Sequence, residues 1–189
     1  MNVFDFDKTI YKNDSSTDFI FYLLKHHPGL LRYVPRIGAD SLLYVLKIYD
    51  KTKMKERFFS VFRGVEDIDK EVEGFWEEKQ CGIKKWYAEV HKEDDIVISA
   101  SPEFLVRPVC EKIGIKNVIA SLVDKKTGTY TGINCYGKEK VRRFREEFPC
   151  GHIEQFYSDS YSDTPLAEIS EEAYLVKGEK LIPWEFRIS

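Results

Sequence analysis

The sequence predicts an α/β fold in which a mostly parallel sheet carries a helical insertion after its first strand. Residues 2–6 form a short apolar run of the length that a buried strand needs. Residues 17–90 follow a helical periodicity, and from residue 95 onward strand-like and helix-like segments alternate. Such alternation favours a parallel sheet, because each crossover helix returns the chain to the same end of the sheet.

The helical insertion contains several apolar faces at helical spacing. The first three faces are formed by Phe19, Ile20, Leu23 and Leu24, by Leu42, Leu43, Leu46 and Tyr49, and by Met54, Phe58, Phe59 and Phe62. Pro28, Pro35 and Gly64 separate these segments, because proline and glycine favour helix ends. The apolar residues of a last expected helix are Val72, Phe75, Trp76, Trp86 and Val90. We therefore expect a bundle of about four helices between the first two strands.

The part of the chain after residue 95 supplies the rest of the sheet. The expected strands are residues 96–99, 116–120, 153–158 and 173–177, and the expected helices are residues 102–113, 138–148 and 164–169. Residues 123–135 interrupt this order with a predicted hairpin, whose turn runs from Asp124 to Gly128. We expect this hairpin to be an excursion from the sheet.

The composition excludes several classes of protein. Hydrophobic residues make up 43% of the 189 residues and charged residues 32%, which predicts a packed globular protein. Lysine plus arginine number 29 against 32 acidic residues, so the net charge of -3 gives no general field that attracts nucleic acid. No C-x-x-C pair occurs, so the cysteines are expected to be reduced thiols. They are Cys81, Cys110, Cys135 and Cys150.

No segment predicts export or a membrane span. Asp5, Asp7 and Lys8 interrupt the first residues, which lack the apolar stretch of a signal peptide. Residues 18–49 are the most apolar region, but charged residues interrupt it. No uninterrupted stretch reaches the roughly 20 apolar residues that a membrane span needs. We therefore expect a cytoplasmic protein without a transmembrane segment.

Two carboxylates stand at the end of the first strand, in the run Asp5-Phe6-Asp7-Lys8-Thr9. Strand side chains two residues apart share a face, and α/β folds bind ligands at the carboxyl ends of parallel strands. Two nearby carboxylates also perturb each other's ionisation, so one can stay a nucleophilic anion while the other holds a proton. The alternative is a solvated strand end without a catalytic role.

A second acidic cluster follows the predicted strand at residues 153–158. Asp159 and Asp163 stand among small hydroxyl residues that include Ser160. Hard oxygen ligands of this kind suit Mg²⁺, which typically takes one or two protein carboxylates together with water and phosphate oxygens. Asp163 also precedes a predicted helix, so helix capping is an alternative role that the same side chain can combine with the first.

Two further segments have features of anion-binding sites. Ser99 ends a buried strand that leads into a helix, where free N–H groups and the helix dipole attract negative charge. Lys138 and Lys140 lie at the start of another predicted helix, where cations are disfavoured unless an anion is nearby. An ordinary N-cap serine and surface lysines are the alternatives.

In this order, the four segments resemble the motifs of the haloacid dehalogenase (HAD) superfamily of aspartate-nucleophile hydrolases. Asp5 to Thr9 resembles motif I, Ser99 motif II, a lysine at 138 or 140 motif III, and Asp159 with Asp163 motif IV. Residues 99–102 and 134–141 are similar to subfamily IB, which includes phosphoserine phosphatase-like enzymes. Lys8 departs from the family, because many members carry glycine there.

The resemblance implies a Rossmann-like HAD core of residues 1–14 and 92–189 and a helical type-1 cap of residues 15–91. It implies a Mg²⁺-dependent phosphomonoester hydrolase, a phosphatase, that acts on a small phosphorylated metabolite through an aspartyl-phosphate intermediate. Asp5 would attack phosphorus, and Asp7 would protonate the leaving oxygen and later activate water. The remaining implied roles are phosphate binding by Ser99 and Lys140, Mg²⁺ binding by Asp5, Asp159 and the main-chain carbonyl of Asp7, and support by Asp163, Thr9 and Ser160. Lys140 fits the family's pattern better than Lys138, because Val141 and Phe144 follow it.

Three alternatives to this hydrolase are a phosphotransferase or mutase, a lipid-phosphate phosphatase, and a non-catalytic phosphate-binding module. The cap would choose the leaving group. Asp14 resembles the acid that meets the substrate ammonium in relatives that hydrolyse phosphoserine, with Arg57 as an anion partner. The Leu, Tyr and Phe residues of segments 19–24 and 30–49 would suit a lipid-like phosphate, but they also suit packing within the bundle.

Overall fold

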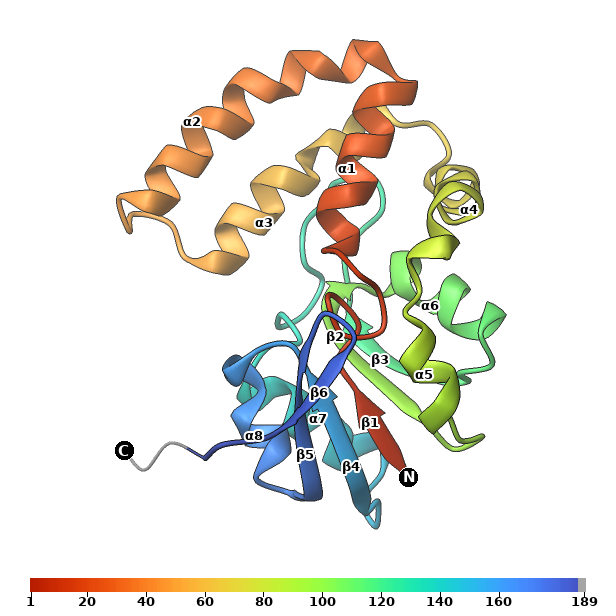
Figure 1. Ribbon diagram of the computed structural model, residues 1–189. Coiled ribbons are helices and arrows are strands. Elements are labelled where there is room, and N and C mark those ends of the chain that lie inside the picture. The colour runs from red at the N-terminus through yellow and green to blue at the C-terminus, as the bar shows by residue number, and fades with distance from the viewer. Residues whose placement is uncertain (187–189) are drawn as a thin grey trace.

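The computed structural model describes residues 1–186 and, within them, the side chains of all residues except 41–44 and 51. The predicted face at Leu42 and Leu43 and the last three residues of the predicted core range therefore lie outside the described residues. Within the described chain, six strands form one sheet in the order β3-β2-β1-β4-β5-β6 (Figure 1). The strands are β1 Asn2–Phe4, β2 Ile96–Pro102, β3 Asn117–Ser121, β4 Ile153–Ser158, β5 Ser170–Lys177 and β6 Lys180–Pro183.

The sheet is parallel except at one edge. β1 pairs in parallel with β2 and β4, and the next strand on each side, β3 and β5, continues the parallel arrangement. β6, which the sequence analysis did not predict, pairs antiparallel with β5. Gly178 lies in the tight turn between them with φ +62°, a conformation that glycine adopts readily and that short hairpin turns require.

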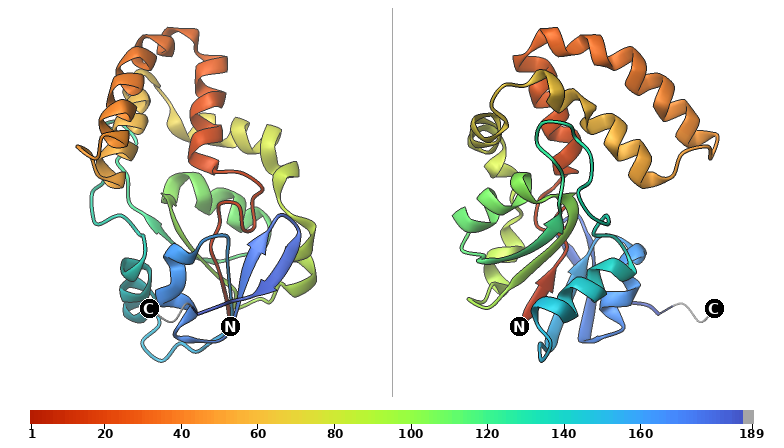
Figure 2. Two further views of the ribbon diagram at one scale, coloured as in Figure 1. Left: turned by 60° about the vertical axis from the view of Figure 1, so that its left-hand side comes forward. Right: turned by 180° about the vertical axis from the view of Figure 1, so that it is seen from behind.

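Helices cover both faces of the sheet and extend beyond its upper end. The α-helices are α1 Ser15–His26, α2 Val34–Val45, α3 Lys51–Phe59, α4 Ile68–Lys79, α5 Lys85–Val90, α6 Glu103–Lys112, α7 Lys138–Glu147 and α8 Thr164–Ala167. Helical turns of the 3-10 type are Pro28–Tyr33, Ser60–Gly64, Gln80–Gly82 and Tyr161–Asp163. α5 and α6 pack on one face and α7 and α8 on the other, while α1 to α4 stand beyond the carboxyl ends of the strands (Figure 2).

Alternating strand residues serve these two helical layers, because successive side chains of a strand point to opposite faces. Val3 packs in one buried cluster with Phe144 of α7. Its neighbour Phe4 packs in another cluster with Leu105 of α6, and this cluster continues into Phe75 of α4. The sheet and the first helices therefore share one continuous apolar core.

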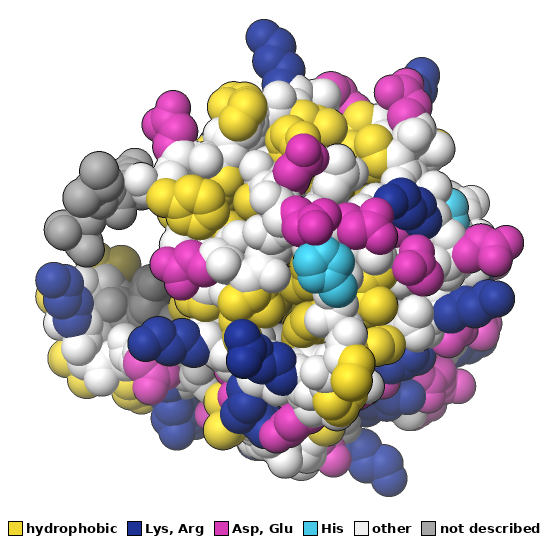
Figure 3. Space-filling view, turned by 90° about the horizontal axis from the view of Figure 1, so that it is seen from below, with side chains coloured by type: hydrophobic (Ala, Val, Ile, Leu, Met, Phe, Trp, Pro, Cys, Tyr) yellow, Lys and Arg dark blue, Asp and Glu magenta, His cyan; other side chains and the backbone are white. Residues whose placement is uncertain are grey.

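The described helices include no membrane span, and one end of the molecule carries a mixed distribution of charge. No helix among the described residues is both long enough and apolar enough to cross a bilayer. Figure 3 shows the end of the molecule at which β1 begins, and basic and acidic side chains are interspersed over it. This mixture agrees with the small net charge of -3.

The helical region differs from the predicted bundle in its last part. The single helix expected through residues 72–90 is two helices, α4 and α5, separated by the turn Gln80–Gly82. The interruption occurs where the chain passes close to Tyr11, since a Cβ at Gly82 would lie 2.5 Å from that ring. α5 then packs on the sheet, with the ring centroid of Trp86 5.2 Å from that of Tyr157.

Residues 123–135 contain the predicted turn and a short hairpin, but neither arm is long enough to form a strand of the sheet. A single antiparallel bridge joins Val123 to Tyr130, and the Asp124 carboxylate accepts from the main chain to build the turn. The segment packs against α3, where the amide of Tyr130 donates to Glu56 at 3.2 Å. Main-chain hydrogen bonds from Asp124 to Thr129 and from Thr131 to Leu122 flank the bridge, so the segment is a short hairpin loop that packs on α3.

Gly128→Ala is expected to lower the free energy of unfolding by about 2–4 kcal/mol. Gly128 has φ +72°, and an added Cβ would lie 2.2 Å from the carbonyl oxygen of Phe59. Gly178→Ala is the matched control, because Gly178 has φ +62° but nothing within 4 Å of the added atom. Urea unfolding of both variants measures the difference. Equal losses would show that the approach to α3 is not what requires glycine at position 128.

Candidate active site

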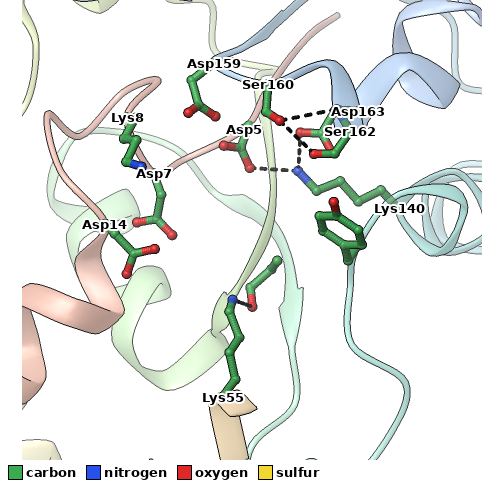
Figure 4. Close-up of a pocket in the computed structure, with 12 residues that line it drawn as sticks. Asp5, Asp7, Lys8, Asp14, Lys55, Lys140, Asp159, Ser160, Ser162 and Asp163 are labelled. Atoms are coloured by element: carbon green, nitrogen blue, oxygen red, sulfur yellow. Dashed lines mark hydrogen bonds and ion pairs between the residues drawn. The ribbon is translucent and has the colours of Figure 1, made fainter. Parts of the chain in front are cut away.

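A cavity of about 210 Å³ opens at the carboxyl ends of β1, β2 and β4 (Figure 4). Its lining residues are Asp5, Asp7, Lys8, Asp14, Lys55, Ala100, Tyr136, Lys140, Asp159, Ser160, Ser162 and Asp163. Neighbouring parallel strands end at the same edge of the sheet, so segments far apart in the sequence meet here.

Lys140 is the centre of a buried ion-pair network. Its Nζ donates to Asp5 Oδ1 and to Asp163 Oδ2, each at 2.7 Å, and only 2% of its side chain is exposed. The hydroxyl of Ser158 also donates to Asp163 Oδ2, at 2.9 Å. Lys138, the other candidate lysine, is exposed. The phase of α7 therefore brings Lys140, and not Lys138, to Asp5.

The network contains two carboxyl groups and only one ammonium group. Burial raises the pKa of Asp5, and the ammonium of Lys140 opposes that rise. Burial alone would lower the pKa of Lys140, but the carboxylates of Asp163 and Asp5 outweigh it and raise this pKa. Lys140 is thus a firmly held cation between two acids. One buried ammonium cannot balance two carboxylates, so a further cation would stabilise the site.

Asp7 is held apart from Lys140 by two other donors. The amide of Ser15 donates to Asp7 Oδ1 at 2.7 Å, and the hydroxyl of Ser101 donates to Oδ2. Ser101 in turn lies 2.9 Å from the hydroxyl of Ser16 at the start of α1. Burial and the nearby Asp14 raise the pKa of Asp7 above its ordinary value. A carboxyl group with a raised pKa can carry and release a proton near neutral pH.

Asp159 lines the same cavity as Asp5 (Figure 4). Its amide donates to Thr9 Oγ1 at 3.0 Å, so the buried threonine ties the loop after β1 to the loop after β4. Burial raises the pKa of Asp159, although the positive charge of Lys8 opposes that rise. Ser160 lines the same wall. The two strand ends thus present their acids to one space.

Ser99 lies behind the cavity wall. It is fully buried, and its hydroxyl accepts a hydrogen bond from the amide of Ser101 at 3.1 Å. The next residue, Ala100, lines the cavity. Ser99 therefore shapes the turn at the end of β2, and its direct contact with phosphate stays a prediction.

α3 presents Lys55 to the cavity and Arg57 to another part of the surface. The Lys55 ammonium donates to the carbonyl of Ala100 at 3.1 Å. Arg57 faces Asp40 at 3.9 Å and lines a separate hollow of about 250 Å³. Helix residues two apart point about 200° away from each other, so the two side chains cannot share a face.

The order and placement of these acids match a known family. The sequence model of the haloacid dehalogenase-like hydrolases matches residues 3–168, which include every acid of the cavity. The chain belongs to this family. The resemblance predicted from the sequence is confirmed, and so are the α/β fold with its mostly parallel sheet and the prediction of an enzyme of this family.

Relatives of this haloacid dehalogenase-like hydrolase agree with the assignment. A Mycobacterium tuberculosis protein named "Probable phosphatase" is 33% identical over 95 residues, which are 46% of this chain and 33% of the relative. The matched part of the chain thus spans only a third of that protein's length. A Bordetella pertussis protein of unknown function has a TM-score of 0.76 and 18% identity, over 93% of this chain and 88% of that chain. A phosphoserine phosphatase, solved as an analogue of its phospho-aspartyl intermediate, has a TM-score of 0.58 and 15% identity, over 92% and 84%. At such identities the two structures show the shared fold.

Five residues that line the cavity were not selected from the sequence as site residues: Lys8, Lys55, Ala100, Tyr136 and Ser162. Ser162 lies in the acidic run around Asp159, which was its signal. Lys55 falls between apolar residues of α3, but a surface lysine has the same pattern. Tyr136 comes from the irregular segment before α7, where no periodicity indicates which side chains turn inward.

Oxygen atoms at the ends of β1 and β4 fit a small divalent cation. Among the described residues, no group of three or more His, Cys, Asp or Glu side chains is arranged to hold a metal. Asp5 and Asp159 bring two carboxylates to the cavity, and both oxygens of the Asp7 carboxylate are already hydrogen-bonded. Asp163 Oδ1 is buried, and none of the described atoms hydrogen-bonds to it. These hard donors are of the kind that Mg²⁺ takes together with water.

Proposed function

We propose that the chain is a Mg²⁺-dependent phosphatase that hydrolyses a small phosphomonoester through an aspartyl-phosphate intermediate. The observation that carries the proposal is the contact of Asp5 with Lys140 at 2.7 Å, in a cavity that Asp159 also lines. A carboxylate beside a cation and a second carboxylate can bind a phosphate group and attack it. The names of the mycobacterial relative and of the phosphoserine phosphatase neighbour support this activity.

In this proposal, residues 1–14 and 92–189 are the catalytic core and residues 15–91 are a cap. The helices α1 to α4 stand beyond the carboxyl ends of the strands, and α3 brings Lys55 to the cavity (Figure 1). A cap in this place would exclude water and select the leaving group.

In the first half-reaction, a carboxylate oxygen of Asp5 attacks phosphorus, and the bond between phosphorus and the leaving oxygen breaks. Asp7 gives its proton to that oxygen, which its raised pKa allows. Two N–H groups of Lys140 hold Asp5 and Asp163, and the third is available for a phosphate oxygen, with Ser99 as the second phosphate-binding residue. Mg²⁺, held by Asp5, Asp159 and the main-chain carbonyl of Asp7, supplies positive charge that offsets the charge of the phosphate.

In the second half-reaction, water attacks the aspartyl phosphate and releases inorganic phosphate. Asp7 is now deprotonated and takes a proton from that water, which regenerates both acids. Asp163 holds Lys140 during both steps, while Thr9 and Ser160 support the loop that carries Asp159. Each residue thus returns to its starting state after one turnover.

The release of inorganic phosphate tests the proposed reaction. We expect free phosphate from at least one member of a panel of phosphorylated metabolites and lipids in the presence of Mg²⁺. A phosphotransferase or mutase would pass the phosphoryl group to another hydroxyl, and a binding module would leave every ester intact. Either result would contradict the proposed hydrolase.

Removal of Mg²⁺ with excess EDTA is expected to stop turnover. Asp159→Ala should raise the Mg²⁺ concentration at half-maximal activity by more than about 10-fold, because the proposed ligand is lost. Glu168→Ala is the control, because Glu168 is an exposed acid outside the cavity. Titration of activity with Mg²⁺ measures the shift, and full activity in EDTA would exclude a metal-dependent reaction.

Phosphoserine is the first substrate to test, because the cavity includes an acid, Asp14, and a base, Lys55, that have no role in the proposed binding of phosphate. Asp14 can meet an ammonium group and Lys55 a carboxylate. Asp14→Asn should lower kcat/KM for phosphoserine by about 10-fold or more while sparing an aryl phosphate. Asparagine keeps the N-cap of α1, in which Asp14 Oδ1 accepts from the amide of Thr17 at 2.8 Å. Equal losses on both substrates, or no phosphoserine turnover by the wild type, would exclude an amino-acid ester.

A phosphate ester with an apolar tail is the second candidate, and the turn between α2 and α3 favours it. Val45, Leu46 and Ile48 are 71%, 60% and 64% exposed there, beside the exposed Lys47. Clustered exposed apolar side chains mark contact sites for apolar partners. Faster hydrolysis of a lysophospholipid-type phosphate than of phosphoserine would favour this substrate.

A further inference from the structure

The two connections between the sheet and helices α1 to α4 run side by side as a short antiparallel ladder. The amide of Lys12 donates to the carbonyl of Gly82 at 2.9 Å, and the amide of Lys84 donates to the carbonyl of Ile10 at 2.8 Å. An antiparallel bridge lies between these two bonds. The ladder begins three residues after Asp7. The chain that returns from the helical region therefore touches the chain that leaves the catalytic loop.

Lys84 places a buried ammonium at the end of this ladder. The residue is 6% exposed, and within the described chain its ammonium forms no ion pair. Its Nζ donates to the main-chain carbonyl of Lys8. Burial lowers the pKa of Lys84, because taking an ammonium out of water costs free energy. A lysine that only filled space would be less costly as a leucine or methionine, so the contact with Lys8 needs an explanation.

Lys8 has a backbone conformation that a lysine avoids. Its φ is +58°, in the left-handed region, which costs a residue with a Cβ about 1–2 kcal/mol. Both of its peptide groups are held, because its amide donates to the carbonyl of Asn13 at 3.0 Å and its carbonyl accepts from Lys84. The peptide plane before Lys8 contains the carbonyl of Asp7. The orientation of that carbonyl therefore depends on the conformation that these bonds hold.

We propose that Lys84 is a positioning residue that holds the turn after Asp7 in its strained conformation, so that the Asp7 carbonyl faces the cavity. The proposal rests on the proposed function, in which this carbonyl is a metal ligand. It also connects the helical region to the reaction, since Lys84 belongs to the segment that follows α4. A movement of that segment would act on the catalytic loop through the ladder and through the side chain of Lys84.

Lys84→Met tests the proposal, with Lys85→Met as the matched control. Methionine keeps the buried apolar stem but cannot donate a hydrogen bond, and Lys85 is the adjacent, exposed lysine. Lys84→Met should lower kcat by about 10- to 100-fold and raise the Mg²⁺ concentration at half-maximal activity, with little change in KM. Lys85→Met should match the wild type. Unchanged kcat in Lys84→Met, or equal losses in both variants, would overturn the proposal.

Hydrogen exchange gives a readout that needs neither Mg²⁺ nor substrate. Peptides that cover residues 6–13 should exchange faster in Lys84→Met than in the wild type and in Lys85→Met, while peptides from α7 exchange alike in all three. Wild-type exchange at residues 6–13 would contradict the positioning role even if activity fell. If the wild-type protein released no phosphate from any ester, the proposed function would be wrong. The exchange experiment would still show whether Lys84 holds the turn after Asp7.

The substitution Lys8→Gly tests whether Lys84 acts through the strained backbone of residue 8 or only through packing. Glycine adopts φ +58° at little cost, so the turn should then depend less on its hydrogen bond with Lys84. In the Lys8→Gly background, Lys84→Met should lower kcat by a clearly smaller factor than in the wild-type background. The same factor in both backgrounds would show that Lys84 does not act through the conformation of residue 8.

Discussion

Asp5→Asn is expected to lower kcat by at least about 10⁴-fold while the protein stays folded. The amide has nearly the volume of the carboxylate, but it cannot act as the anionic nucleophile. Its oxygen can still accept a hydrogen bond from Lys140, which also keeps its contact with Asp163 at 2.7 Å. The expected loss is therefore chemical and not structural.

Mass spectrometry of rapidly quenched enzyme checks this prediction. The wild type should carry a phosphoryl group on the peptide that contains Asp5, and the variant should carry none. Asp94→Asn is the control for an Asp-to-Asn change, because Asp94 has a side chain that is 60% exposed and lies outside the cavity. Thermal unfolding should give similar midpoints for all three proteins. Turnover by Asp5→Asn close to that of the wild type would rule out Asp5 as the nucleophile.

The sheet is the part of the fold that the sequence predicts best. β4 has its predicted bounds, Ile153–Ser158, because its apolar residues Ile153, Phe156 and Tyr157 are followed by a polar segment. Apolar residues are expected in a central parallel strand, since both of its faces are covered. β6 escaped prediction because Lys180–Pro183 is a short edge strand with one apolar pair, which a loop can equally contain.

The helical region is harder to predict because its apolar residues serve different partners. The aromatic pattern continues smoothly from Trp76 to Trp86, but Trp76 packs among the helices and Trp86 packs on the sheet. Periodicity shows that a side chain is buried and does not show what buries it. The break at Gly82 follows from its approach to Tyr11, a contact between segments about 70 residues apart.

The residues of the candidate site also differ in how well the sequence predicts them. Asp5, Asp7, Asp159 and Asp163 are predictable because each lies at or within a few residues of the end of a strand that the sequence also predicts. Lys140 is separated from Lys138 by the phase of α7, in which Lys140 shares a buried face with Phe144, four residues on. Lys55 could not be chosen over Arg57, because the rotation of α3 about its axis is set by tertiary packing.

Asp7→Asn is expected to lower kcat by about 10²- to 10⁴-fold, by removing a proton rather than by changing the shape of the site. The amide oxygen can accept from the amide of Ser15 as Oδ1 does, at 2.7 Å, and the amide N–H groups can donate to the hydroxyl of Ser101. The turn after β1 therefore keeps its contacts. Asparagine can neither protonate the leaving oxygen nor take a proton from water.

Two substrates separate these two roles of Asp7. An aryl phosphate has a good leaving group that needs little protonation, so in Asp7→Asn the phosphoryl group should reach Asp5 and then wait for a water that no base activates. Phosphorylated Asp5 should accumulate and be visible by mass spectrometry. An alkyl phosphate needs the proton in the first step, so it should give slow turnover without accumulation. If Asp7→Asn hydrolysed the alkyl ester at the wild-type rate, Asp7 would transfer neither proton. An alkoxide leaves only with the help of an acid, so the loss of that acid has to slow the turnover of this ester.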